Sequence, residues 1–87
     1  MADDQATILF YCTLWCPDCT RARRLLDERG VPYRCIDIDE DAEGEAFVLR
    51  VNTGYRSVPT LVFPDGAVLV EPSNAELADR LEQLGLG

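Results

Sequence analysis

The 87-residue sequence predicts an α/β fold in which three helices flank a four-stranded mixed sheet, in the order β-α-β-α-β-β-α. Its length leaves room for one small domain. Short β-prone runs alternate with segments that have helical apolar spacing, and the last two β-prone runs are separated by Pro64-Asp65-Gly66, a turn sequence. We therefore expect one domain over residues 1–87, with residues 1–6 as a flexible N-terminal extension.

The first half of the chain predicts a parallel βαβ unit. Residues 7–12 form a continuous β-prone run, which is typical of a strand covered on both faces. Pro17 suits the first position of a helix, and Gly30 suits its end. Residues 33–38 form a second strand about twenty residues beyond the first, a spacing that favours parallel pairing through a helical crossover.

The second half predicts a helix, a hairpin and a last helix. The acidic stretch 37–45 opens the helix, because carboxylates complement the positive end of a helix dipole. Residues 61–63 and 67–70 form the hairpin strands, and Ser73 with Glu76 makes a capping box for the last helix. The expected apolar sides of the two helices consist of Phe47, Val48 and Val51, and of Leu77, Leu81 and Leu84.

The composition excludes several kinds of chemistry. Sixteen acidic residues face eight basic ones, all of them arginine, so the net charge is −8. Without histidine there is no imidazole catalysis, and without lysine there is no Schiff base and no P-loop. The negative charge disfavours nucleic acid and anionic membranes as partners. No apolar run is long enough to span a membrane, and the first residues do not resemble a targeting segment, so a cytoplasmic protein is expected.

The main chemical signal is a pair of cysteines, Cys16 and Cys19, at the start of the first predicted helix. Free backbone N–H groups at that position stabilise a thiolate, so we expect Cys16 to be a nucleophile with a pKa in the range of roughly 3.5 to 7.5. Cys19, one turn later, is the expected resolving thiol. Asp18 opposes the thiolate, so Asp18→Asn is expected to lower the pKa of Cys16. Positive potential is expected from Arg21, Arg23 and Arg24.

The two other cysteines leave alternatives open. Cys12 and Cys35 could join the pair in a zinc site, because four sulfur ligands suffice for structural zinc. Their position inside strand-like runs instead favours partly buried apolar side chains. A regulatory disulfide between Cys12 and Cys16 is a further alternative.

Two features near the cysteine pair suggest a substrate surface. Trp15 directly precedes the nucleophile and is expected to form a rim on which a substrate lies, with a core position as the alternative. A cis bond between Val58 and Pro59 would leave the Val58 backbone free to pair with an extended substrate. Otherwise Pro59 simply starts a strand.

Cys-Pro-x-Cys after a β-strand, with Val-Pro-Thr about forty residues later, resembles the glutaredoxin branch of the thioredoxin superfamily. The resemblance implies a thioredoxin fold, a cis peptide before Pro59, and thiol-disulfide exchange through a redox-active disulfide of Cys16 and Cys19. Glutathione-dependent members carry a lysine where this chain has Thr13 and a tyrosine where it has Asp18. Their Gly-Gly and Asp, which hold the glutamyl end of glutathione, are missing from residues 69–74.

Three separated blocks are most similar to the mycoredoxins: Thr-x-Trp-Cys at 13–16, Val-Asn-x-Gly-x-Arg-x-Val-Pro-Thr at 51–60, and Asp-Gly-x-x-Leu-x-x-Pro-Ser at 65–73. This resemblance implies reduction of mixed disulfides between proteins and mycothiol. Mycothiol is a sugar-linked acetylcysteine without the two carboxylates of glutathione. The residues expected to shape its groove are Thr13, Trp15, Val58 and Pro59, together with Arg56, which either binds substrate or caps local carbonyls.

The implied partners are mycothiolated proteins and mycothiol with its NADPH-dependent reductase, with no tightly bound cofactor and a monomeric protein. Two functions of the same fold remain alternatives: a glutathione-dependent glutaredoxin, and an electron donor to ribonucleotide reductase. A non-catalytic module that holds zinc or an iron-sulfur cluster is an alternative of a different class.

Overall fold

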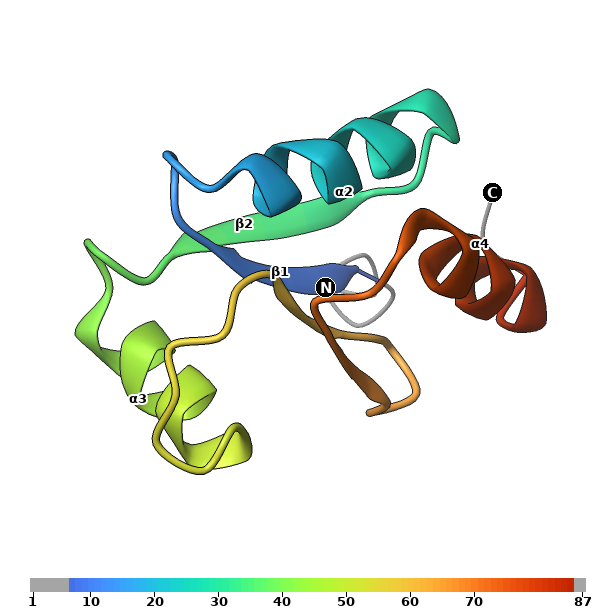
Figure 1. Ribbon diagram of the computed structural model, residues 1–87. Coiled ribbons are helices and arrows are strands. Elements are labelled where there is room, and N and C mark those ends of the chain that lie inside the picture. The colour runs from blue at the N-terminus through green and yellow to red at the C-terminus, as the bar shows by residue number, and fades with distance from the viewer. Residues whose placement is uncertain (1–6, 86–87) are drawn as a thin grey trace.

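The computed structural model describes residues 7–85 and confirms the predicted order of elements (Figure 1). The predicted extension, residues 1–6, lies outside the described part. The strands and helices are β1 (Ile8–Cys12), α2 (Pro17–Glu28), β2 (Tyr33–Asp37), α3 (Ala42–Val51), β3 (Thr60–Val62), β4 (Val68–Val70) and α4 (Asn74–Gln83).

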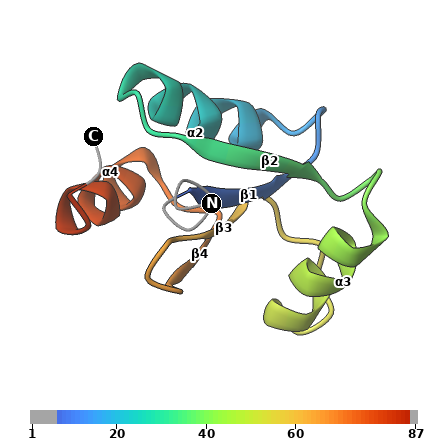
Figure 2. The same ribbon diagram turned by 180° about the vertical axis from the view of Figure 1, so that it is seen from behind.

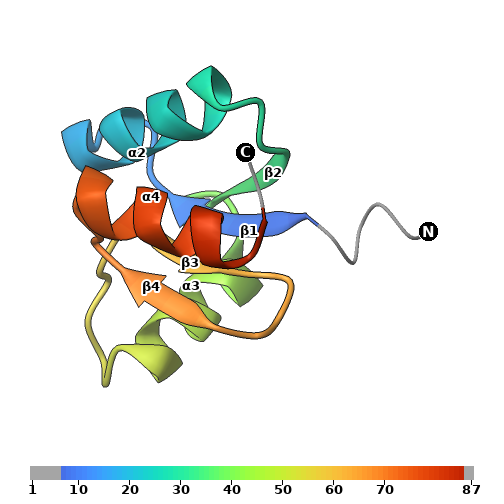
Figure 3. The same ribbon diagram turned by 90° about the vertical axis from the view of Figure 1, so that its right-hand side faces the viewer.

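The sheet is mixed, with the strand order β2-β1-β3-β4. β1 and β2 pair in parallel, as the βαβ unit predicts, whereas β3 pairs antiparallel to both β1 and β4. The helices α2 and α4 lie on one side of the sheet and α3 lies on the other (Figures 2 and 3). The carboxyl ends of the parallel strands β1 and β2 therefore open onto the same edge of the molecule.

The core consists of two clusters, one on each face of the sheet. Ile8, Phe10 and Cys12 of β1 face α2 and α4. Tyr11 faces α3, where it stacks on Phe47 with ring centroids 4.8 Å apart. This alternation along β1 confirms that both faces of the strand are covered.

The helix boundaries follow the predicted caps. Pro17 begins α2, and Gly30 adopts a φ of 67° after its end, a conformation that glycine takes without strain. The reciprocal capping box of Ser73 and Glu76 begins α4. None of the helices in residues 7–85 has the length and apolar character needed to cross a membrane.

The second helix begins later than the first acidic residues. Asp41 caps α3 by accepting a hydrogen bond from the Gly44 N–H at 2.9 Å, whereas Asp37 still belongs to β2. The prediction that Val51 belongs to the apolar side is wrong, since its side chain is exposed. The side of α3 that faces the sheet follows the buried Gly44 and Val48 and continues to Asn52, whose side chain donates to Thr60 at 3.2 Å, so Val51 lies beside this row.

Candidate active site

The cysteine pair lies where the chain passes from β1 into α2. After Cys12 the chain turns through residues 13–15, and Cys16 takes the position that caps α2, with φ −82° and ψ 119°. Its side chain is half-buried, while Cys19, one turn into the helix, is only 3% exposed. Of the two thiols, Cys16 is therefore the accessible one and Cys19 is the shielded one.

The four cysteines of the chain are neighbours in the fold, because Cys12 and Cys19 belong to the core cluster under α2, Cys16 packs against it and Cys35 contacts Cys12. Cys16 and Cys19 hydrogen-bond to each other, and Cys19 also hydrogen-bonds to Cys12. The Cys12 and Cys35 sulfurs are 3.3 Å apart. All four cysteines are reduced.

The low pKa is found at Cys19 rather than at the expected Cys16. The hydrogen bond from the Cys12 thiol is the main reason that the pKa of Cys19 falls from 9.0 to about 6; a backbone bond from Thr13 and the Cys16 thiol also contribute. Burial raises the pKa of Cys16, although the N–H groups of Cys19 and Asp18 act in the opposite direction. The predicted low pKa of Cys16 is therefore wrong for the reduced protein, because the desolvation of this thiol raises its pKa more than the N–H groups at the start of α2 lower it.

The charged side chains that were expected to affect Cys16 interact mainly with other groups. Asp18 raises the pKa of Cys19 through its negative charge, rather than that of Cys16. Arg21 pairs with Asp18 at 3.7 Å and donates to the Asn74 side chain at 2.6 Å, which ties α2 to α4. Arg23 donates to the Cys35 sulfur at 3.9 Å. Arg21 and Arg23 thus have structural partners of their own.

Trp15 is exposed, as a substrate rim requires. Its side chain is 69% exposed, and its indole N–H donates to Asp39 at 3.0 Å. Arg56 donates to the other oxygen of Asp39 at 2.6 Å and to Glu45 at 2.7 Å. Arg56 is therefore bound to carboxylates and does not cap carbonyls. The network holds the indole beside the Cys16 turn.

The Val58–Pro59 bond is cis, as the family resemblance implies. The Val58 carbonyl faces the Cys16 thiol, which donates to it at 3.9 Å. Pro59 is buried, and its carbonyl accepts a hydrogen bond from the Glu71 N–H at 2.8 Å. The cis segment therefore lies against Cys16, and Glu71 lies against the cis segment.

Thr13 lies beneath the surface instead of facing a groove. It is 2% exposed, and within residues 7–85 its buried hydroxyl oxygen has no hydrogen-bond partner. Its contribution to substrate binding stays a prediction.

Cys12 and Cys35 differ in their surroundings. Cys12 is buried in the core, as expected, but the expectation that Cys35 is partly buried is wrong, because this side chain is exposed. β2 is an edge strand, so no further strand within residues 7–85 lies beside Cys35. No group of three or more His, Cys, Asp or Glu side chains in the described chain is arranged to hold a metal ion.

The sequence did not predict the contact of Asp39 with Trp15 or the contact between Cys12 and Cys35. Both follow from the parallel pairing of β1 and β2. Asp39 follows β2 as Trp15 follows β1, and the carboxyl ends of parallel strands meet at one edge. The same pairing places Cys35 beside Phe10 and Asp37 beside Cys12, so the two cysteines are diagonal neighbours.

Comparisons with known proteins agree with this geometry. A glutaredoxin family model matches residues 8–68. The chain is 38% identical to mycoredoxin 1 of Corynebacterium glutamicum over 79 residues, which cover 91% of this chain and 98% of the relative. It is 35% identical to a putative glutaredoxin of Mycobacterium tuberculosis over 79 residues, 91% of this chain and 94% of the relative.

Solved structures show the same architecture. A glutaredoxin from Archaeoglobus fulgidus superposes with a TM-score of 0.66 at 28% identity, covering 94% of this chain and 88% of that one. A thioredoxin-like protein superposes with a TM-score of 0.68 at 29% identity, covering 90% of this chain and 99% of that one. The fold is therefore the thioredoxin fold.

Proposed function

The chain belongs to the glutaredoxin family of thiol-disulfide oxidoreductases, and we propose that it reduces mixed disulfides between proteins and mycothiol, with Cys16 as the nucleophile and Cys19 as the second catalytic thiol. The observation that carries this proposal is the half-buried Cys16 thiol at the start of α2, in hydrogen-bond contact with a Cys19 of depressed pKa. Only Cys16 of this pair can meet a disulfide that approaches from outside.

The first step transfers mycothiol to the enzyme. The Cys16 sulfur attacks the mycothiol sulfur, an S–S bond forms between them, and the target protein leaves as a thiolate that takes up a proton. Because Cys16 has a raised pKa and Cys19 a pKa of about 6, the Cys19 thiolate is the proposed acceptor of the Cys16 proton. The hydrogen bond between the two thiols supports this proton transfer.

The adduct has two routes of release. In one, a second mycothiol attacks the adduct and frees Cys16, and an NADPH-dependent reductase then reduces the mycothiol disulfide. In the other, Cys19 attacks Cys16, mycothiol leaves, and the Cys16–Cys19 disulfide forms. The contact between the two sulfurs supports the second route.

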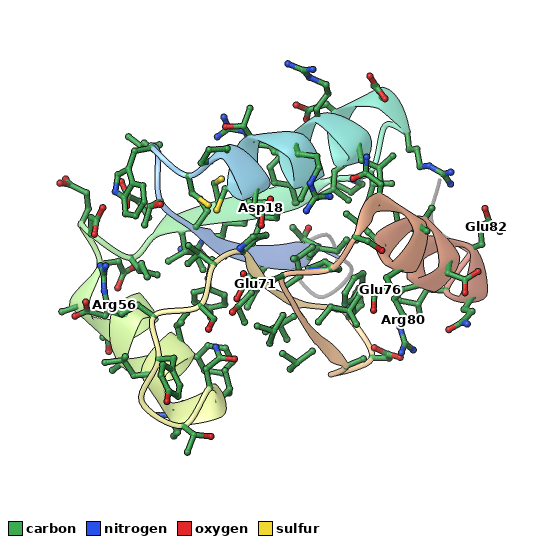
Figure 4. The ribbon with its side chains drawn as sticks, viewed as in Figure 1. Asp18, Arg56, Glu71, Glu76, Arg80 and Glu82 are labelled. Carbon is green, nitrogen blue, oxygen red and sulfur yellow. The ribbon has the colours of Figure 1, made fainter. Side chains whose placement is uncertain are left out.

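The surface around Cys16 supports mycothiol over glutathione as cosubstrate. Exposed carboxylates lie at Asp18 in the motif and at Glu71 beside the cis segment; both are labelled in Figure 4. A lysine clamp is absent, because Thr13 takes that position. Glutathione carries two carboxylates that these charges repel, whereas mycothiol carries none. We propose that Trp15 and Val58 line the groove, while Pro59, Thr13 and Arg56 position them from behind.

The proposal also covers the setting of the reaction. We place it in the reducing cytoplasm, where mycothiol and its reductase keep thiols reduced, and we treat residues 1–87 as one monomeric domain. The protein targets are defined by their mixed disulfide with mycothiol.

The test uses a Cys19→Ser variant, which cannot resolve the adduct. After incubation with mycothiol disulfide, the expected product is a single mycothiol adduct located on Cys16 by peptide mass. A Cys16→Ser variant is the matched control and stays unmodified at this peptide. Absence of the adduct would refute the mycothiol assignment. So would faster turnover of a glutathione mixed disulfide than of a mycothiol mixed disulfide by the protein without substitutions.

A further inference from the structure

A second pair of thiols, Cys12 and Cys35, lies outside the reaction described above. Their sulfurs are 3.3 Å apart, although 23 residues separate them in the chain. They lie on adjacent parallel strands and on the face of the sheet that α2 covers, since Cys35 pairs with the inward-facing Phe10. An approach of just over an ångström would bring the sulfurs to the S–S bond length of about 2.05 Å.

Cys12 links this pair to the catalytic pair. Its thiol hydrogen-bonds to both Cys19 and Cys35. Together with the contact between Cys16 and Cys19, this makes a continuous series of sulfur contacts from Cys16 through Cys19 and Cys12 to Cys35. Both ends of the series reach solvent, because Cys16 is half-buried and Cys35 is exposed.

Cys35 lies in a place that a partner molecule can reach. It is exposed, and it belongs to β2, which is an edge strand of the sheet. The Arg23 guanidinium donates to the Cys35 sulfur at 3.9 Å from the side of α2. This contact holds the exposed side chain over Cys12.

We propose that Cys12 and Cys35 form a second redox-active dithiol that receives a disulfide from Cys16 and Cys19 through the contact between Cys19 and Cys12. This inference rests on the proposed function, because it begins with the Cys16–Cys19 disulfide. It gives the protein a second dithiol, whose disulfide is formed from the catalytic pair and is reduced by small thiols that attack the exposed Cys35 sulfur.

The transfer is an internal exchange that needs no added oxidant. Cys12 attacks the Cys19 sulfur, the Cys12–Cys19 bond forms, and Cys16 leaves as a thiol with the proton that Cys12 gave up. Cys35 then attacks the Cys12 sulfur, the Cys12–Cys35 bond forms, and Cys19 leaves as a thiol. One disulfide breaks and one forms, so two electrons and two protons move from the second pair to the first.

Tryptic mapping separates the two disulfides. Trypsin cleaves after arginine, so Cys12, Cys16 and Cys19 fall in peptide 1–21 while Cys35 falls in peptide 35–50. A Cys16–Cys19 disulfide stays within one peptide, whereas a Cys12–Cys35 disulfide joins two. The reduced protein is treated with one equivalent of bis(2-hydroxyethyl) disulfide, quenched in acid, alkylated, digested without reduction and analysed by mass.

The expected result is a joined peptide, 1–21 with 35–50, in which Cys16 and Cys19 are alkylated. A Cys16→Ser variant, which cannot form the Cys16–Cys19 disulfide that the transfer starts from, is expected to lose the joined peptide. Serine is a good helix cap, so this variant keeps the start of α2. Absence of the joined peptide in the unmodified sequence, or an equal yield in Cys16→Ser, overturns the transfer.

A Cys35→Ala variant distinguishes this inference from the proposed function. It is expected to form the internal disulfide of peptide 1–21, because Cys16 and Cys19 are intact. If that disulfide forms while the unmodified sequence gives no joined peptide, the second dithiol is wrong and the first stands. If the internal disulfide fails to form, the proposed dithiol chemistry itself is wrong.

Discussion

Replacing Cys12 by alanine is expected to raise the pKa of Cys19. The thiol of Cys12 is the largest cause of the depressed pKa of Cys19, and alanine cannot donate a hydrogen bond in its place. A Cys12→Ser variant keeps a donor at the same position and should retain a low pKa. Cys35→Ala is the control for the loss of a neighbouring cysteine that does not itself contact Cys19.

The size of the effect follows from the ionised fraction at neutral pH. With a pKa of about 6, about 90% of Cys19 is thiolate at pH 7. If the pKa of Cys19 returned to the ordinary value of 9.0, about 1% of this side chain would be thiolate at pH 7. The Cys12→Ala variant should fall between these limits. The sign is that of an acid with a lowered pKa: the thiolate is present above about pH 6 and is lost as the pH falls below it.

The assay is the ultraviolet absorbance of the thiolate in the reduced protein, titrated between about pH 4 and pH 9. The unmodified sequence should show a first step near pH 6. That step belongs to the hydrogen-bonded cluster, and its movement in Cys12→Ala shows which donor controls it. Alkylation of Cys16 at pH 7 provides a second measurement, because loss of the Cys19 thiolate removes the proposed acceptor of the Cys16 proton.

Three outcomes would refute this reasoning. One is a titration of the unmodified sequence with no step below about pH 8, which means that no thiolate is stabilised in the cluster. The other is a first step that stays in place in Cys12→Ala, which means that Cys12 does not donate to Cys19. The third is a step that moves by the same amount in Cys35→Ala as in Cys12→Ala, which means that the hydrogen bond from Cys12 is not the specific cause of the low pKa.

Three further changes probe the scaffold around the site. Gly44→Ala gains about 1 kcal/mol of helix propensity, but the new Cβ would lie 2.8 Å from Ile36 Cγ2. Because such overpacking costs about 1–3 kcal/mol, we expect a net loss of stability of about 1 kcal/mol. Calorimetry should then show a fall in Tm of roughly 4–8 °C. Ser73→Ala should cost about 1 kcal/mol in urea unfolding, and an unchanged midpoint would mean that the capping box is not needed. Asp39→Asn should release Trp15, the single tryptophan, which is expected to change its fluorescence and raise KM with little effect on kcat; an unaltered spectrum would contradict the contact.

Local signals account for the parts of the fold that the sequence predicted. Pro17 and Gly30 mark the ends of α2, and the Ser73 capping box marks the start of α4, because each acts within a few residues of itself. The wrong expectations concern burial. Val51 has helical apolar spacing and Cys35 lies in a β-prone run, but both are exposed: Val51 lies beside the row of α3 residues that faces the sheet, and Cys35 lies on the edge strand β2.

The features of the candidate site also include some that depend on local sequence and some that depend on contacts between distant residues. The placement of Cys16 and Cys19 at a helix start was predictable, since the motif and its helix are contiguous. The partners of Trp15 were not, because Asp39 and Arg56 reach it from the ends of other elements. The low pKa at Cys19 also depends on the non-local packing of Cys12 beneath the helix.

The sequence by itself determined the order of the elements, the position of a cysteine pair at a helix start and the absence of histidine and lysine chemistry, because these depend on residue type and short spacing. The tertiary structure alone decided at which thiol the pKa is depressed and that Cys12 contacts both Cys19 and Cys35. The physical reason is that the register of β1 on β2, and the packing of α2 over both strands, bring together side chains that no local pattern relates.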